Sequence, residues 1–204
     1  MAPSALGASH VLLIACCVAL PHAPRLLDAG CCEYLSYDDP ANFVHNRFVQ
    51  QLSWPNIRWA LADGVILVRR PALLTPRQSP PLTDADGWGQ GVWEPVSLLF
   101  RMGYQTALGA AAPACLRVNL ALHAANTCAV YLLLAQRAPR HARRGSDGAW
   151  RWCCCLSALC FGLHPLCTEV VCWASAQGYG LSGLLALTAV ITLPPAPSRC
   201  PSRR

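Results

Sequence analysis

Two adjacent carboxylates, Asp38 and Asp39, follow the first apolar run of the chain within the string Tyr37-Asp38-Asp39-Pro40. Such a pair can act as a general base, or it can hold a divalent cation beside a phosphate. The alternative is an exposed turn, because Asp and Pro both favour turns. Their position at the mouth of a predicted membrane segment favours chemistry on a lipid-linked sugar.

His164 and Glu169 form a second candidate pair, inside a later apolar run. Ionisable groups within a membrane are costly, so they are functional candidates by default. The alternative is hydrogen bonding between helices, with Pro165 bending the helix. The sequence leaves both interpretations open.

A polar stripe is formed by Asn119, His123 and Asn126, at spacings of four and three that place them on one helical face. Polar atoms in a bilayer need partners, so this stripe is predicted to face other helices. A metal site built from His123, His164 and nearby cysteines lacks paired ligand spacing, and none is predicted. Most of the thirteen cysteines lie in apolar runs, where packing is favoured over disulfides.

The composition indicates a membrane protein. Of the 204 residues, 54% are hydrophobic and 13% are charged, whereas about a quarter of a typical soluble domain is charged. Apolar residues concentrate in four runs near the length that crosses a bilayer, at 5–27, 113–135, 152–174 and 178–193. We therefore predict an all-α, multispan membrane protein with three or four transmembrane helices.

The arginines set the predicted orientation. Segment 136–151 carries five arginines against one acid, and short arginine-rich loops stay in the cytoplasm. This places the long loop 28–112 on the luminal side. Aromatic residues do not interleave with the arginines as in a nucleic-acid interface, so nucleic acid is not a predicted partner. Segment 1–27 is either a signal peptide or a retained span, and the missing basic start favours a retained span.

Two helices and one irregular insert are predicted within the luminal loop. Ser53 is placed to cap a helix with Pro55 in its first turn and apolar residues at 57, 61 and 65. An amphipathic helix is predicted over 94–108. Residues 69–90 are rich in proline without a period, which predicts disorder, and their edges match those of a translated intron. The tail 194–204 is also predicted to be disordered.

Four motifs occur in an order that resembles a known family. They are Tyr37-Asp-Asp-Pro-Ala-Asn-Phe-Val-His-Asn46, Trp93-Glu-Pro-Val-Ser-Leu-Leu-Phe-Arg101, Val118-Asn-Leu-Ala-Leu-His-Ala-Ala-Asn126 and Leu163-His-Pro-Leu-Cys-Thr-Glu-Val-Val-Cys-Trp173. This order resembles the N-terminal membrane part of the transmembrane and tetratricopeptide-repeat O-mannosyltransferases, which belong to the C-type glycosyltransferase superfamily. The resemblance covers residues 34–68 and 91–190.

The resemblance implies a multi-pass protein of the endoplasmic reticulum membrane that transfers mannose from dolichyl-phosphate mannose to Ser or Thr hydroxyls. It implies Asp38 and Asp39 as catalytic residues. It further implies His164, Glu169 and Arg101 as substrate-binding residues of a luminal pocket. The expected partners are membrane lipid, the dolichyl-linked donor and luminal acceptor proteins, and a divalent metal is an optional cofactor.

The chain also departs from the family pattern. Glu94 stands where the family usually has Arg, and Ala176-Gln177-Gly178-Tyr179 stands where it usually has Gly-Arg-Ala-Asp/Glu. Without those arginines and the family's further spans and repeats, we expect an incomplete or inactive fragment of such an enzyme. The alternative is a non-enzymatic small membrane protein, an assembly or transport factor that uses the polar stripe.

Overall fold

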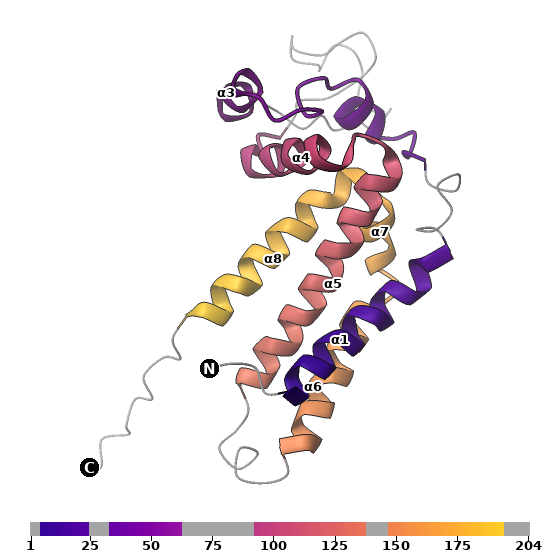
Figure 1. The fold of residues 1–204 in the computed structure, drawn as a ribbon, viewed down its shortest axis with the longest axis vertical. Coiled ribbons are helices and arrows are strands. Elements are labelled where there is room, and N and C mark those ends of the chain that lie inside the picture. The colour runs from indigo at the N-terminus through magenta and orange to yellow at the C-terminus, as the bar shows by residue number, and fades with distance from the viewer. Residues whose placement is uncertain (1–4, 25–32, 63–91, 138–146, 194–204) are drawn as a thin grey trace, which may run out of the picture.

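The structure, a computed structural model of the chain, describes residues 5–24, 33–62, 92–137 and 147–193 (Figure 1). The predicted disordered insert 69–90 and tail 194–204 lie outside these ranges, as does most of the arginine-rich loop.

The described residues form an all-helical fold, which confirms the all-α part of the prediction. The elements are α1 (Ala5–Ala19), η1 (Leu20–His22), the π-helix η3 (Pro40–Val44), α3 (Trp54–Ala62), α4 (Pro95–Leu108), α5 (Ala112–Gln136), α6 (Asp147–Gly162), α7 (Cys167–Cys172), η5 (Ala174–Ala176) and α8 (Gln177–Thr192).

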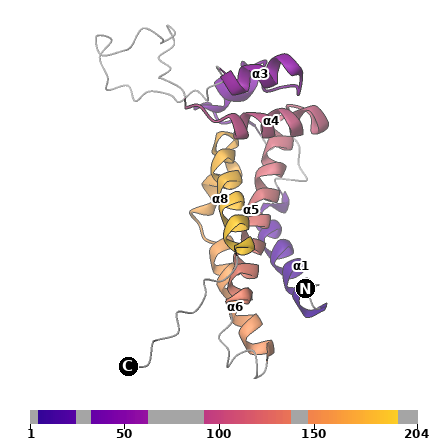
Figure 2. The ribbon, with the colours of Figure 1, turned by 90° about the vertical axis from the view of Figure 1, so that its left-hand side faces the viewer.

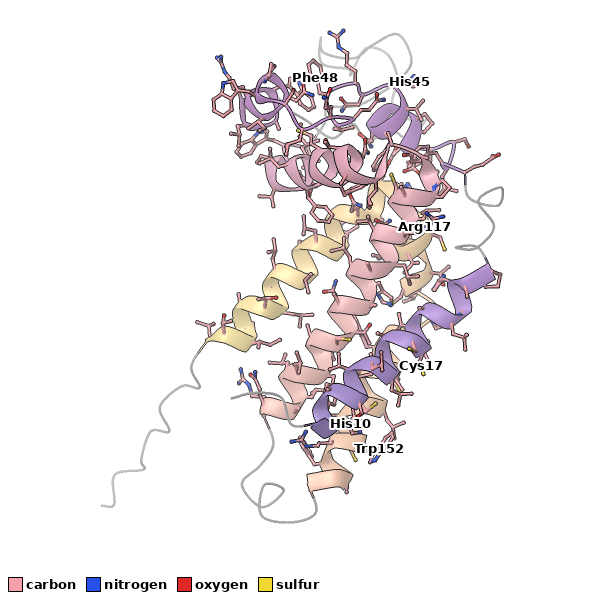
Figure 3. All side chains as sticks on the ribbon, in the orientation of Figure 1. His10, Cys17, His45, Phe48, Arg117 and Trp152 are labelled. Atoms are coloured by element: carbon pink, nitrogen blue, oxygen red, sulfur yellow. The ribbon has the colours of Figure 1, made fainter. Side chains whose placement is uncertain are left out.

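Helix α5 is the centre of an elongated bundle and contacts α1, α6, α7 and α8. A second layer, made of α3 and α4, lies across the end of the bundle at which α5 and α8 begin (Figures 1 and 2). His10 and Trp152 lie at the opposite end, with ring centroids 4.7 Å apart (Figure 3). Among the described residues, helices therefore lie across one end of the bundle and not across the other.

Within the described ranges, two helices are long and apolar enough to cross a membrane, namely α5 and the continuous η5–α8 segment Ala174–Thr192. The apolar helix near the N-terminus, Gly7–His22, is shorter. Segment 152–174, predicted as one span, is instead two helices, because α6 ends at Gly162 and α7 begins at Cys167. Pro165 lies in this break. Proline interrupts a helix there because it lacks an N–H and disfavours helical backbone at the residue before it.

The bundle exposes large apolar side chains and buries a set of polar ones. The exposed apolar side chains on α1, α6 and α8 are Leu12, Leu13, Leu156, Phe161, Leu185 and Val190. Polar side chains of α5 and α8 are buried instead: Asn119, His123, Asn126, Thr127 and Gln177. Proteins in water show the reverse distribution, whereas helices in lipid often meet through small and polar residues.

Close packing of α1, α5 and α6 forms the apolar core of the bundle. Ile14, Val18 and Tyr131 are buried there beside Cys154 and Cys155. Cys153, the first of the three consecutive cysteines, is exposed. The three thiols therefore point in different directions, and two of them fill the core as small apolar groups.

The predicted helices of the α3–α4 layer are present. The backbone N–H of Asn56 donates to Ser53 Oγ at 3.4 Å, which confirms Ser53 as the cap of α3. Leu61 was predicted to lie on the apolar face of α3, and this is wrong, because Leu61 is 52% exposed. Ala60 packs against α4 instead. Helix α4 matches the predicted segment 94–108 within one residue.

Candidate functional site

Asp39 is buried at the start of η3, with 1% of its surface exposed. Its Oδ1 atom accepts hydrogen bonds from the backbone N–H of Ser175 at 2.8 Å and from Ser175 Oγ at 2.6 Å. Its Oδ2 atom accepts one from the backbone N–H of Leu35 at 3.0 Å. Asp38 is 4% exposed, so the alternative of an exposed turn is wrong for both carboxylates.

Arg101 reaches the same serine from α4 and is fully buried. Its guanidinium lies over the Phe43 ring, 4.5 Å from the centroid, and Nη2 donates to the backbone carbonyl of Ser175 at 3.5 Å. Ser175 thus contacts the carboxylate through its N–H and hydroxyl, and the guanidinium through its carbonyl. The structure brings together two of the predicted site residues, Asp39 and Arg101, at this serine.

Burial affects the pKa of Arg101. Loss of hydration lowers the pKa of the guanidinium, and Tyr104 and the Glu94 carboxylate oppose that shift. The ordinary pKa of arginine is so high that the group stays charged in proteins. A buried positive charge with a nearby buried carboxylate therefore forms the electrostatic centre of the site.

A chain of hydrogen bonds fixes the position of the segment that carries Asp39. Tyr104 donates its hydroxyl to Cys115 Sγ at 3.2 Å, and Tyr34 donates to the carbonyl of Ala110 at 2.7 Å. Because the Tyr34 proton is used there, Cys115 donates to Tyr34 across 3.0 Å. Burial is the main cause that raises the pKa of Tyr34 and of Tyr104, so both phenols stay neutral at physiological pH.

The polar stripe of α5 pairs with neighbouring helices, as predicted. Asn119 donates to the carbonyl of Trp173 at 2.9 Å, and Asn126 donates to the carbonyl of Gly180 at 2.8 Å. His123 Nε2 lies 2.9 Å from the carbonyl of Gly162, which requires a proton on that nitrogen. A protonated nitrogen cannot ligate a metal, in agreement with the interpretation of the stripe as packing.

His164 and Glu169 are exposed, at the α6–α7 turn and within α7. His164 Nδ1 accepts a hydrogen bond from the backbone N–H of Leu166 at 3.3 Å, within its own turn. The structure therefore does not bring this predicted pair into the buried cluster of Asp39 and Arg101. Among the described residues, no group of three His, Cys, Asp or Glu side chains is arranged to hold a metal ion.

Ser175, Tyr34 and Tyr104 belong to this cluster and were not singled out from the sequence. Gln105 and Gln177 are buried near Tyr104. Gln105 was not singled out either, and Gln177 was named only as a departure from the family pattern. The position of Gln105 carries one usable indication, because it follows Arg101 by four residues in a predicted amphipathic helix. Ser175 carries no local indication, because its partner Asp39 is 136 residues away.

The cluster has the chemical means for proton transfer next to an anionic group. A carboxylate offers about four acceptor positions, and described residues occupy three of those on Asp39. The remaining position on Oδ2 suits a hydroxyl that loses its proton. Arg101 supplies a fixed positive charge beside it, with two nitrogens that no described residue contacts by a hydrogen bond.

Comparison of the whole chain with protein-family models, with curated proteins and with solved structures finds no match.

Proposed function

We propose that the chain is a membrane-embedded protein of the glycosyltransferase type, with Asp39 as general base and Arg101 as the residue that binds the donor phosphate. The observation that carries the proposal is the meeting of a buried carboxylate and a buried guanidinium at Ser175. The identity of the donor, dolichyl-phosphate mannose, and of the acceptor, a Ser or Thr hydroxyl of a luminal protein, comes from the motif resemblance.

The proposed step is an inverting displacement. The acceptor hydroxyl gives its proton to Asp39 Oδ2 while its oxygen attacks the anomeric carbon of the sugar. The bond between that carbon and the phosphate oxygen breaks, and the lipid phosphate leaves with the electron pair. Arg101 stabilises the negative charge that develops on the leaving phosphate.

A multi-pass arrangement in the endoplasmic reticulum membrane is part of the proposal. Its support is the exposed apolar surface of α1, α6 and α8 together with the buried polar side chains between α5 and α8. Helix α4 lies across the end of this bundle, which suits a helix at the level of the lipid headgroups (Figure 2). Exposed Trp54 and Trp93 flank this layer, as expected for residues at a membrane interface.

The alternative of a non-enzymatic assembly factor gains no observation in its favour. That alternative used the stripe of Asn119, His123 and Asn126 to bind a partner. The amide and ring nitrogens of the stripe already pair with carbonyls of the same chain.

The proposal is tested by transfer of labelled mannose in membranes that contain the full chain, with Asp39→Asn as the variant. Asparagine keeps the volume and the Oδ1 acceptor but is not a base, so transfer should fall about a hundredfold or more. Glu33→Gln is the matched control, because Glu33 is an exposed carboxylate near the same loop. Unchanged transfer by Asp39→Asn, or no transfer above membranes without the chain, contradicts the proposal.

A further inference from the structure

Three buried side chains beside the Asp39 cluster have polar atoms without a hydrogen-bond partner among the described residues. They are Arg101 at Nε and Nη1, Gln105 at Nε2 and Oε1, and Gln177 at Oε1. Arg101 is fully buried, and the two glutamines are each 2% exposed. Buried polar groups in folded proteins are nearly always paired, so several unpaired atoms in one place need an explanation.

These three side chains are neighbours. Arg101 and Gln105 are four residues apart and share one face of α4. Gln177 is the first residue of α8, which contacts α4. Both glutamine amides lie near the Tyr104 hydroxyl and oppose the rise in its pKa that burial causes, but neither meets the distance and angle of a hydrogen bond to it. The unpaired atoms therefore gather where α4 crosses the start of α8.

The same face of α4 continues to Glu94, which is half-buried at the edge of the group. A Cβ atom built on Gly178 would lie 2.9 Å from Glu94 Oε2 and 3.3 Å from Ser97 Oγ. The glycine thus lets the Glu94 carboxylate approach the start of α8. Glu94 adds acceptor oxygens at the side of the group that is open to the surroundings.

The unpaired atoms include both donors and acceptors, and this mixture restricts the ligand. The nitrogens of Arg101 and Gln105 donate, whereas the carbonyl oxygens of Gln105 and Gln177 accept. A phosphate or carboxylate would satisfy the donors alone, and a cation would satisfy the acceptors alone. Hydroxyl groups both donate and accept, so a lipid-linked sugar satisfies the whole set, its phosphate at Arg101 and its hydroxyls at the two glutamines. Buried water would do so too, and the experiment separates the two.

We propose that Gln105 and Gln177, beside the phosphate-binding Arg101, form a seat for the hydroxyl groups of a hexose, the sugar of the lipid-linked donor. This inference rests on the proposed function, because it places the sugar of that donor beside Asp39. Arg101, four residues before Gln105, contacts the Ser175 carbonyl, and Asp39 accepts from the N–H of the same serine.

The test compares two ligands on the purified full chain in lipid nanodiscs: a polyprenyl phosphate that carries mannose and the same polyprenyl phosphate without sugar. The wild-type protein should bind the mannosyl lipid more tightly. Gln105→Met and Gln177→Met keep the side-chain volume and remove the amide, so each should lower this preference about tenfold. Gln51→Met, at an exposed glutamine, is the matched control and should keep the preference.

A second measurement needs no variant. Wild-type protein should bind a deoxymannosyl lipid more weakly than the mannosyl lipid, because one hydroxyl of the ligand is missing. Equal binding of all the lipids overturns the seat and leaves buried water in its place. If the glutamine variants lose as much affinity for the sugar-free lipid as for the mannosyl lipid, the seat is overturned in favour of an anion site.

The failure of the seat and the failure of the proposed function give different results. Asp39→Asn should lose transfer and keep the preference for the mannosyl lipid. A wild-type protein that transfers no mannose but prefers the mannosyl lipid contradicts the proposed function and leaves the seat standing. Transfer that depends on Asp39, without any effect of the glutamine variants on the preference, contradicts the seat alone.

Discussion

Ser175 joins two charged side chains that come from distant parts of the chain. Its hydroxyl and N–H point to Asp39, and its carbonyl points to Arg101. The charges are thus held near each other through one neutral residue, while the Arg101 guanidinium also rests on the Phe43 ring. Such an arrangement orients a base without consuming all of its acceptor positions.

The phenols beside this site predict a dependence of stability on alkaline pH. Burial, followed by the hydrogen bond with Cys115, raises the pKa of Tyr34 above its usual range. An unfolded chain loses the Tyr34 proton near pH 10, at the ordinary pKa of about 10, whereas the folded chain keeps it. Above that pH the unfolded state binds fewer protons, so the free energy of unfolding falls as the pH rises.

Tyr34→Phe removes one ionisable phenol from this balance. The free energy of unfolding of the variant in detergent should therefore fall less between pH 9 and pH 11 than that of the wild-type protein. Thermal or denaturant unfolding at both pH values measures the difference. Equal falls in the two proteins would show that Tyr34 ionises alike in the folded and unfolded states.

The sequence predicts the individual helices best and the contacts between helices least. Local patterns give the cap at Ser53, the helix 94–108 and the polar face of α5, because each depends on residues within a turn or two. The break between α6 and α7 was predicted only as a bend at Pro165. The contact between Asp39 and Ser175 has no pattern at all, since it depends on how η3 and η5 meet in space.

The end of α6 offers a sharp test of helix packing. A Cβ atom built on Gly162 would lie 2.7 Å from Thr127 Cγ2 and 2.8 Å from Val18 Cγ2. These short side chains belong to α5 and α1 and are buried, so they have little room to move. Gly162→Ala should therefore lower the free energy of unfolding by about 1–3 kcal/mol through overpacking.

Gly148→Ala is the matched control in the same helix, because a Cβ atom there meets nothing within 4 Å. It should leave stability unchanged or raise it, since alanine favours helix over glycine. Unfolding in detergent, followed by circular dichroism, measures both variants. Equal stability of the two variants would contradict the close approach of α1, α5 and α6 at Gly162.

The whole molecule combines a bundle with an apolar exterior and a helical layer across one end. The bundle suits a membrane, because it exposes apolar side chains and buries polar ones. Arg101 of this layer, Asp39 before η3 and the proposed glutamine seat lie at that end. Our central claim is that this end faces the lumen, where a lipid-linked sugar and an acceptor protein meet.

Glycosylation mapping in endoplasmic reticulum membranes tests the central claim most directly. Pro81→Asn creates an acceptor triplet with Leu82 and Thr83 in the loop between α3 and α4, and Arg144→Asn creates one with Gly145 and Ser146 between α5 and α6. We predict a glycan, removable by endoglycosidase, on Pro81→Asn and none on Arg144→Asn. A glycan on Arg144→Asn, with none on Pro81→Asn, would place the carboxylates in the cytoplasm and contradict the luminal orientation.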